Sequence, residues 1–312
     1  MTTDELSLTM KQVKEAENAS ASFRDYVSLT KIEITVANLM ATFAGLWVAS
    51  HGHPRLSVTA AVLLGTALVV GAGAIFNNFL DRDIDVKMLR TQERAIASGK
   101  VAPERALALG AALGAVGLVD LLIFVNPTAA LTAAVGLVMY SYIYTVWLKR
   151  KTTLSTVLGG IAGAAPPLVG FAAGSGGSLG FAAWAMFFIF FLWQPPHFLP
   201  LAMKRSEEYR AAGIPMLPVV RGFGPTKWQI LRYTAALLPV SVLLYAANAE
   251  SLLYLVTALG LGIWFLVLAI QGLFVEDDLA WARKVFKFSL IYLTVLCVAM
   301  VVGVYHVVPF RW

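Results

Sequence analysis

Three polar side chains, Asn77, Asp81 and Asp85, follow at intervals of four residues after an apolar run over about residues 58–76. On a helix that continues out of that run, this spacing places all three on one face, with Asn78 beside them. Carboxylate oxygens on one face suit a hard divalent cation such as Mg²⁺, which binds through one or two carboxylates and a substrate phosphate. The spacing therefore predicts a site for a magnesium–phosphate pair.

Two arginines in the same stretch, Arg90 and Arg94, are also four residues apart, and Lys87 lies close by in the sequence. A guanidinium group is always charged and pairs with two phosphate oxygens at once. The alternative interpretation is a solvated, charged loop after a membrane helix, in which none of these side chains binds a ligand. The regular spacing and a second polar stretch later in the chain favour the binding site.

The second polar stretch begins with the sequence WQPPHF at residues 193–198, near the end of another apolar run. Two adjacent prolines lack backbone donors, so we expect a break or kink at this point, where His197 lies. An imidazole can accept a proton or ligate iron near neutral pH, and the alternative is a hydrogen-bonded structural histidine. Glu207, Glu208 and Tyr209 follow and are candidates to complete the cation site or to orient the loop.

The composition indicates a polytopic membrane protein. Of 312 residues, 59% are hydrophobic and only 13% are charged, whereas a soluble domain carries about 25% charged residues. The single cysteine, Cys297, excludes a disulfide framework. The net charge of +6 does not require a nucleic-acid partner, because the distribution of the basic residues follows the predicted membrane topology.

Run length predicts an all-α fold with nine transmembrane helices, and we expect these helices to surround a central cavity. The expected spans are residues 32–50, 57–80, 104–125, 128–147, 154–174, 180–201, 230–248, 252–273 and 286–308. Residues 1–30 lack a signal-peptide pattern and are expected to form a cytoplasmic tail, whose last part lies along the membrane interface. Residues 31–312 are expected to form a single membrane domain.

All but two of the 24 lysines and arginines, Arg55 and Arg311, fall on the same side of the nine spans. The positive-inside rule therefore predicts a cytoplasmic N-terminus, an outer C-terminus and a central cavity that opens to the cytoplasm. The two long loops, after the second and sixth spans, lie on this basic side, where we expect the site.

The motifs together resemble the protoheme IX farnesyltransferase (heme O synthase) family, a branch of the intramembrane prenyltransferases. The resemblance covers most of the chain after residue 30. It rests on the NxxxDxxxD spacing at residues 77–85, YTxWLKR at 144–150, AGAAPPLVG at 162–170, WQPPHF at 193–198 and AGIPMLPVV at 212–220. The first motif is typical of the whole superfamily, and the fourth and fifth are typical of the heme branch.

This resemblance implies a function and a set of site residues. The implied reaction joins the farnesyl group of farnesyl diphosphate to a vinyl group of heme B with addition of water, and gives heme O and diphosphate. Mg²⁺ is implied on Asn77, Asp81, Asp85 and Glu208. The implied diphosphate-binding residues are Asn77, Asn78, Arg90, Arg94, Lys149 and Lys204.

The resemblance also implies the setting and leaves some roles open. The catalytic residues would be Asp81, Asp85 and His197, and His197 would either hold heme or take a proton. In the related branches the second motif reads DxxxD, whereas here Ala212 stands four residues after Glu208, so the second cation site is an open question. A bacterial plasma membrane is the implied location, and heme A synthase the implied downstream partner.

Two competing functions share part of the pattern. A prenyltransferase for an aromatic quinone precursor shares the first acidic motif but does not explain WQPPHF. A secondary transporter also uses broken helices and intramembrane acids, but it would not need Asp81 for a covalent product.

Several residues outside the motifs remain open. Asp120 lies inside the third span and either reaches the outer interface or bonds to a neighbouring helix. His51 and His53 are either loop residues or ligands. Tyr140, Tyr142, Tyr144 and Trp147 form either an interfacial belt or a cavity wall, and Trp147 fits the belt better.

Overall fold

The computed structural model describes residues 21–304. These residues are mainly helical and contain no strand. Nine helices or helix pairs in this range are long and apolar enough to cross a membrane, as the sequence predicted. They are Ile32–Ala49, Leu56–Leu80, Pro103–Val125, Pro127–Lys151, Ser155–Gly174, Phe181–Lys204, Phe223–Ala246, Leu252–Gln271 and Asp278–Gly303.

Two spans begin well before the expected boundaries. The seventh helix, α14 (Phe223–Ala246), starts seven residues early, and the ninth, α16 (Asp278–Gly303), starts eight residues early. Their first turns contain lysines and arginines, which a search for apolar runs excludes although the helix continues through them. Asp277 caps α16 by accepting hydrogen bonds from the backbone N–H groups of Leu279 and Ala280.

The two double prolines of the chain have different effects. Pro166 and Pro167 follow a break at Ala164, which separates α9 (Ser155–Gly163) from α10 (Ala165–Gly174). We expected a break or a kink at Pro195 and Pro196; the helix has no break there, because α11 (Phe181–Lys204) continues through both prolines. The Gln194 side chain donates to the Gly160 carbonyl of α9 at 2.8 Å, so neighbouring helices support α11 where its own backbone donors are missing.

The most buried helices are α10 and α11, followed by α4 (Leu56–Leu80). Helix α3 (Ile32–Ala49) packs along α10 and α4, and α11 packs against α14 and α16. Helices α6 (Pro103–Asp120) and α15 (Leu252–Gln271) lie at the periphery. The pairing of α3 with α10 depends on glycine: a Cβ at Gly170 would overlap the Thr42 carbonyl oxygen, and small residues let two membrane helices approach this closely.

We expect Gly170→Val to destabilise the protein by about 1–3 kcal/mol, because the new side chain forces α3 and α10 apart. The thermal unfolding midpoint of the purified protein in detergent measures the effect. Gly260→Val is the matched control, because nothing lies within 4 Å of a Cβ at Gly260. Equal midpoints for the two variants would contradict the close approach.

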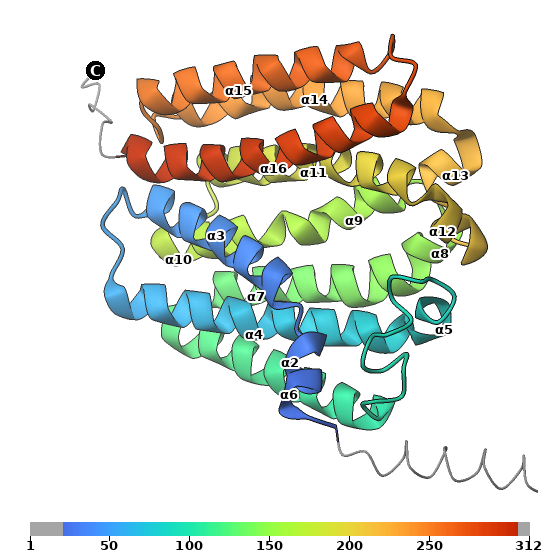
Figure 1. Cartoon of the computed structure of the whole chain (residues 1–312). Helices are drawn as coiled ribbons and strands as arrows, with labels where there is room; N and C mark the ends of the chain where they lie inside the picture. Colours follow the sequence, from blue (N-terminus) through green and yellow to red (C-terminus); the bar gives the residue numbers. More distant parts are fainter. Residues whose placement is uncertain (1–20, 305–312) are drawn as a thin grey trace, which may run out of the picture.

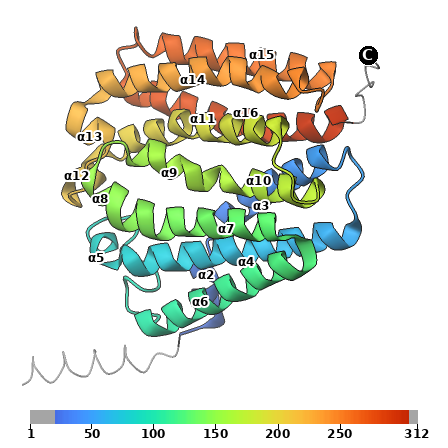
Figure 2. The same ribbon diagram turned by 180° about the vertical axis from the view of Figure 1, so that it is seen from behind.

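The short helices gather at one end of the molecule. In Figure 1 and in the reverse view of Figure 2, α5 (Arg82–Asp85), α8 (Lys149–Lys151), α12 (Ser206–Ala211) and α13 (Leu217–Arg221) share this end. The two long basic loops therefore lie together, as expected from their position in the sequence. We call this end the loop end.

The segment expected to be a tail is partly folded onto the helices. Residues 1–20 lie outside the described residues, but Phe23–Leu29 forms helix α2, which begins with a capping box between Ser22 and Asp25. Leu29 is buried in a cluster with Ile75 of α4. Helix α2 thus connects the start of α3 to the loop end.

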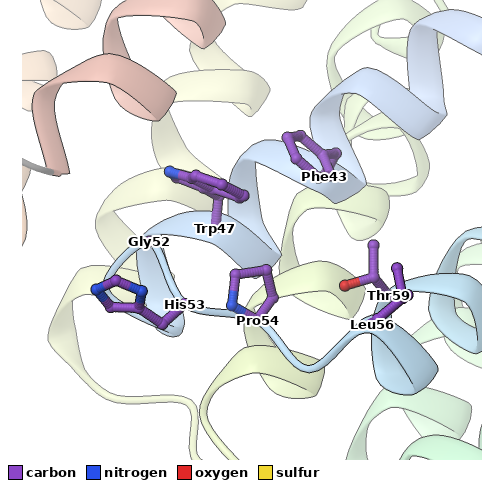
Figure 3. Close-up of a pocket in the computed structure, with 7 residues that line it drawn as sticks. All are labelled: Phe43, Trp47, Gly52, His53, Pro54, Leu56 and Thr59. Carbon is purple, nitrogen blue, oxygen red and sulfur yellow. The ribbon is translucent and has the colours of Figure 1, made fainter.

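A groove of about 480 Å³ lies at the opposite end, next to the loop that joins α3 to α4. Figure 3 shows Phe43 and Trp47 on α3 and His53 on that loop. His51 and His53 are exposed, and no group of three histidine, cysteine or acidic side chains within residues 21–304 is arranged to hold a metal. The structure thus gives no metal-site geometry for the two histidines.

Candidate active site

Asp81 lies at the end of α4 and is buried between charged groups. Its Oδ2 accepts hydrogen bonds from Asn77 Nδ2 at 2.8 Å and from Lys149 Nζ at 2.6 Å. Asn77 also donates to Thr145 Oγ1 at 3.2 Å. Because a buried ion pair needs such close partners to offset desolvation, Asn77, Asp81 and Lys149 form one connected unit from two distant segments.

Lys31, which the sequence interpretation missed, completes this unit. Its Nζ donates to Asn77 Oδ1 at 2.7 Å. Burial and the nearby Arg94 charge lower the pKa of Lys31 to about 7. Lys31 has a left-handed backbone (φ 49°) directly before α3, a conformation that is strained for a residue with a side chain.

Asp85 is buried and has a different partner from Asp81. Arg94 Nη1 lies 2.8 Å from Asp85 Oδ2 and 3.0 Å from Oδ1. Thr91 Oγ1 donates to the Asp85 backbone carbonyl and holds the loop in place. Asp85 of the acidic motif and Arg94 of the basic pair thus form an ion pair within the same loop.

Asp83, two residues from each of the other acids, points to a different partner. It forms an exposed pair with Arg150 at 2.7 Å, which lowers the pKa of Asp83. Arg150 Nη2 also lies 3.9 Å from Asp81 Oδ1. Four basic side chains therefore surround three carboxylates, and the excess of positive charge suits a phosphate group.

The oxygens that lack partners match the preference of Mg²⁺. Asp81 Oδ1, Asn78 Oδ1 and Glu208 Oε2 are buried and accept no hydrogen bond within the described chain. All three are hard oxygen ligands. Asp81 binds Lys149 through Oδ2, and its Oδ1 accepts no hydrogen bond from the described residues. Both Asp85 oxygens accept hydrogen bonds from Arg94, so a metal at Asp85 would share the carboxylate with the guanidinium group. The donor set fits Mg²⁺.

The second long loop packs directly against the first. Ile84 and Met88 share a buried cluster with Ala202, Ile214 and Met216. The AGIPMLPVV motif therefore packs under the acidic loop, which explains how two motifs far apart in the sequence serve one site.

The charged residues of the two loops also come together. Partial desolvation and the nearby Arg205 charge lower the pKa of Arg90, and burial raises the pKa of Tyr209. Arg205 thus lies closer to the predicted phosphate-binding arginines than the sequence suggested. Lys204 is exposed at the end of α11 and forms no ion pair within the described residues, and Glu208 is half-buried on α12.

A π-helical segment places two tyrosines next to Asp81. This segment, η2 (Met139–Leu148), continues α7 (Pro127–Val138) and leads directly to Lys149, and π-helical turns are frequent at functional sites. The rings of Tyr140 and Tyr144 stack with centroids 6.0 Å apart. A Cβ at Gly73, one turn before Asn77, would lie 3.2 Å from the Tyr140 ring, so this ring packs one turn deeper on the helix face that carries Asn77.

The other two aromatic candidates of this segment, Tyr142 and Trp147, have exposed side chains. Tyr142 and Trp147 are 67% and 57% exposed on the outer surface of the bundle. The aromatic cluster therefore divides into a wall beside the acidic site and a belt that faces the surroundings, which for Trp147 is the position expected at a membrane interface.

Asp120 is half-buried at the end of α6, where one of its oxygens packs against α4. A Cβ at Gly65 of α4 would lie 2.6 Å from Asp120 Oδ2, and this oxygen accepts no hydrogen bond from the described residues. Asp120 directly precedes the π-helical segment η1 (Leu121–Val125). The structure thus places it against α4 and gives it no contact with the acidic loop.

His197 lies between α11 and α16, and none of its described contacts involves Asp81 or Asp85. Its Nδ1 is 2.8 Å from Ser289 Oγ. That hydroxyl donates to the Phe286 carbonyl at 2.6 Å, so it accepts from His197, which leaves Nε2 unprotonated in the neutral ring. The imidazole stacks on Trp193 and on Phe286, and Nε2 has no hydrogen-bond partner in the described chain.

For His197→Ala we expect a large loss of activity with a smaller loss of stability. If Nε2 serves the reaction, the variant should lower kcat by about 10²-fold, within the usual range for a proton-transferring group. Ser289→Ala is the matched control, because it removes the Nδ1 partner and keeps the imidazole. Unchanged turnover in His197→Ala would return the residue to a structural role.

Comparison with known proteins agrees with this geometry. The sequence profile described as the UbiA prenyltransferase family matches residues 38–291. The chain belongs to the UbiA prenyltransferase family. The resemblance drawn from the motifs is therefore confirmed, and the family match spans both the acidic loop and α11.

Curated relatives are similar along most of their length. A protoheme IX farnesyltransferase from Alkalihalophilus pseudofirmus is 48% identical over 292 residues, which cover 92% of each sequence. A protein of the same name from Symbiobacterium thermophilum is 46% identical over 94% of this chain and 98% of its own.

Solved structures of UbiA proteins share the fold. A structure described as digeranylgeranylglyceryl phosphate synthase has a TM-score of 0.77 at 21% identity, with 90% of this chain and 98% of that chain covered. A UbiA homolog from Archaeoglobus fulgidus, solved with GPP and Mg²⁺, has a TM-score of 0.59 at 17% identity, with 89% and 99% covered.

Proposed function

We propose that this protein transfers the farnesyl group of farnesyl diphosphate to a vinyl group of heme B, with addition of water, to give heme O and diphosphate. The observation that carries the proposal is the high identity, over nearly whole chains, to proteins named protoheme IX farnesyltransferase. The cluster of Asp81, Lys149 and Lys31 supports it, because its excess positive charge suits a diphosphate.

Mg²⁺ is part of this proposal. Asp81, Asn77, Asp85 and Glu208 are the predicted ligands, and the unpartnered oxygens of Asp81 and Glu208 support two of these assignments. The GPP- and Mg²⁺-bound structure of the Archaeoglobus fulgidus homolog supports the choice of ion. When bound, Mg²⁺ would supply positive charge to the leaving diphosphate.

The basic side chains would stabilise the negative charge that develops as the bond between C1 and the diphosphate oxygen breaks. Lys149 and Lys31 already lie on Asp81 and Asn77, so they need little reorganisation to meet a diphosphate at this position. Asn78, Arg90, Arg94 and Lys204 are further predicted diphosphate-binding residues. Arg205 joins this set because its charge lies near Arg90.

The allylic cation must meet the heme vinyl carbon before it meets water. The Tyr140 ring packs against Gly73 of α4, one turn deeper than Asn77, and stacks on Tyr144, so the pair would limit the access of water to C1. Attack by the vinyl group leaves a positive charge next to the porphyrin ring. One water then adds there, loses one proton, and leaves a hydroxyl group.

His197 is a candidate for two roles in this step. Its free Nε2 would either hold heme or accept the proton that the added water loses. Either role requires heme to reach the space between α11 and α16.

The location and partners follow from the same assignment. We propose a bacterial plasma membrane, with the loop end and the N-terminus in the cytoplasm and the C-terminus outside. The basic residues gathered at the loop end support this orientation. Heme A synthase would be a downstream partner, because it would consume heme O.

Membranes that contain the protein, incubated with labelled farnesyl diphosphate and either heme B or an aromatic acid, test the function. We expect labelled heme O only with heme B, and only when Mg²⁺ is added. A prenylated aromatic acid would favour the quinone-precursor enzyme, and no covalent product with either acceptor would contradict a prenyltransferase.

A further inference from the structure

A buried carboxylate lies at the end of the molecule opposite to the loop end. Glu250, in the loop between α14 and α15, is 2% exposed, and neither of its carboxylate oxygens has a hydrogen-bond partner in residues 21–304. The next side chain, Ser251, is also buried, and its hydroxyl has no partner either. Buried polar groups are nearly always paired, so three oxygens on adjacent residues without a partner among the described residues mark this point as a candidate ligand site.

Two of these oxygens, Glu250 Oε2 and Ser251 Oγ, lie next to the same residue of α16, Gly303. A Cβ at Gly303 would lie 2.6 Å from Glu250 Oε2 and 3.3 Å from Ser251 Oγ. Because both oxygens border the same position, one small ligand can reach both. Gly303, which has no side chain, is what allows the carboxylate to approach the helix.

The helix end at this point favours a positive ligand. Helix α16 ends at Gly303, beside the Glu250 carboxylate, and the last carbonyl groups of a helix carry a partial negative charge. A carboxylate beside them is destabilised unless it holds a proton or a cation. Burial raises the pKa of Glu250 to about 9, which agrees with this electrostatic environment.

No protein cation neutralises Glu250 within the described residues. The neighbouring polar groups are Tyr254, whose hydroxyl donates to the Ser241 carbonyl at 2.8 Å, and, further along α16, Cys297 and Tyr292. None of these side chains carries a positive charge. The described residues hold no group of three histidine, cysteine or acidic side chains at this point, so a divalent or transition metal is a poor match.

We propose that Glu250, Ser251 and the C-terminal end of α16 form a binding site for a small monovalent metal cation such as Na⁺. The ligands are hard oxygens, which suit an alkali cation. One cation enters as one carboxyl proton leaves, so the charge of the site is balanced in both states. The bound cation would tie the loop between α14 and α15 to the end of α16.

The full-length protein in lipid nanodiscs tests this site, with the thermal unfolding midpoint followed by tryptophan fluorescence. Sodium, lithium, potassium and choline chlorides are compared at one ionic strength. We expect sodium to raise the midpoint in a saturable way relative to choline. Because binding displaces a proton, the apparent sodium affinity should increase about tenfold for each unit by which the pH is raised, as long as the pH stays below the carboxyl pKa.

The pH dependence in choline has a definite sign. The folded carboxyl keeps its proton up to about pH 9, whereas in the unfolded chain it loses the proton near its ordinary pKa of 4.5. The folded state therefore binds more protons between these values, and this group lowers the stability as the pH rises. Sodium should reduce this slope.

In Glu250→Gln, sodium should no longer raise the unfolding midpoint. The part of the decrease in stability with rising pH that comes from the Glu250 carboxyl should also disappear. Glu276→Gln, which changes an exposed acid at the loop end, is the matched control and should keep both. If Glu250→Gln fails to fold, Ser251→Ala serves instead and should weaken the sodium response. Equal midpoints in sodium and choline, or an unchanged response in Glu250→Gln or Ser251→Ala, would overturn the proposal.

Discussion

Asp81→Asn is expected to reduce heme O formation by about 10³-fold while the protein remains folded and inserted in the membrane. Asp81 is the acid that keeps one oxygen free while its other oxygen binds Lys149 and Asn77. The substitution removes the negative charge at this point and keeps the size of the side chain. A metal ion contributes several kcal/mol of charge stabilisation, and about 1.4 kcal/mol corresponds to a tenfold change in rate.

The measurement is labelled heme O per amount of folded protein in membranes. Asp83→Asn is the matched control: it makes the same chemical change two residues away, at an exposed acid paired with Arg150. Exposed pairs contribute at most about 1 kcal/mol, so this variant should stay within severalfold of the wild type. If Asp81→Asn keeps normal turnover, Asp81 does not hold the metal.

Unfolding must be measured for Asp81→Asn as well, because the change leaves Lys149 without its counter-charge. Loss of one partner of a buried pair costs about 3–5 kcal/mol. Asp81→Asn combined with Lys149→Met removes both charges, so it should recover stability without recovering activity. Recovered activity in the double variant would mean that the single variant failed through misfolding.

The nine spans could be predicted because the bilayer sets one length for every apolar run. The same physical argument located the loop end, since basic residues distribute by side of the membrane. The prediction from apolar runs was wrong at the starts of α14 and α16, where the helix extends beyond its apolar part through charged residues such as Lys227 and Lys284. Of the break or kink expected at Pro195, the break is absent for a related reason: helix packing, which a local pattern does not contain, supports α11.

The local part of the site could also be predicted, because a spacing of four residues places side chains on one helix face. This applies to Asn77 and Asp81, which are hydrogen-bonded to each other. The partners of these residues come from segments far away in the chain, such as Lys31 before α3. A single sequence carries no signal of such contacts beyond an isolated lysine at the start of the first span.

His197 illustrates a different limit. Its motif was recognised, yet its contacts are with α16, at Ser289 and Phe286. No pattern around His197 points to those residues. Whether its free Nε2 serves heme is therefore a question for the His197→Ala variant, and the interpretation from the sequence stays a prediction.

Lys31→Met is expected to lower kcat/KM by about 10²-fold, the usual effect of removing one preorganised donor from a developing negative charge. Lys31 reaches Asn77 across 46 positions of the sequence, at a hydrogen-bond distance of 2.7 Å. Methionine keeps most of the buried stem and removes the ammonium group. Product formation at several concentrations of farnesyl diphosphate measures the effect, and Lys100→Met, at an exposed lysine of the same end, should leave it unchanged.

Two substitutions at Lys31 distinguish a catalytic role of its side chain from a structural role of its backbone. A left-handed residue with a side chain costs about 1–2 kcal/mol, and glycine adopts φ values near the observed 49° without this strain. Lys31→Gly should therefore be as inactive as Lys31→Met but unfold at a higher temperature than that variant. If both variants keep full activity, Lys31 only anchors the turn between α2 and α3, and Lys149 and the arginines bind the diphosphate without it. Loss of activity in both variants, with the higher unfolding temperature in Lys31→Gly, would assign the role to the side chain that contacts Asn77 and not to the backbone conformation.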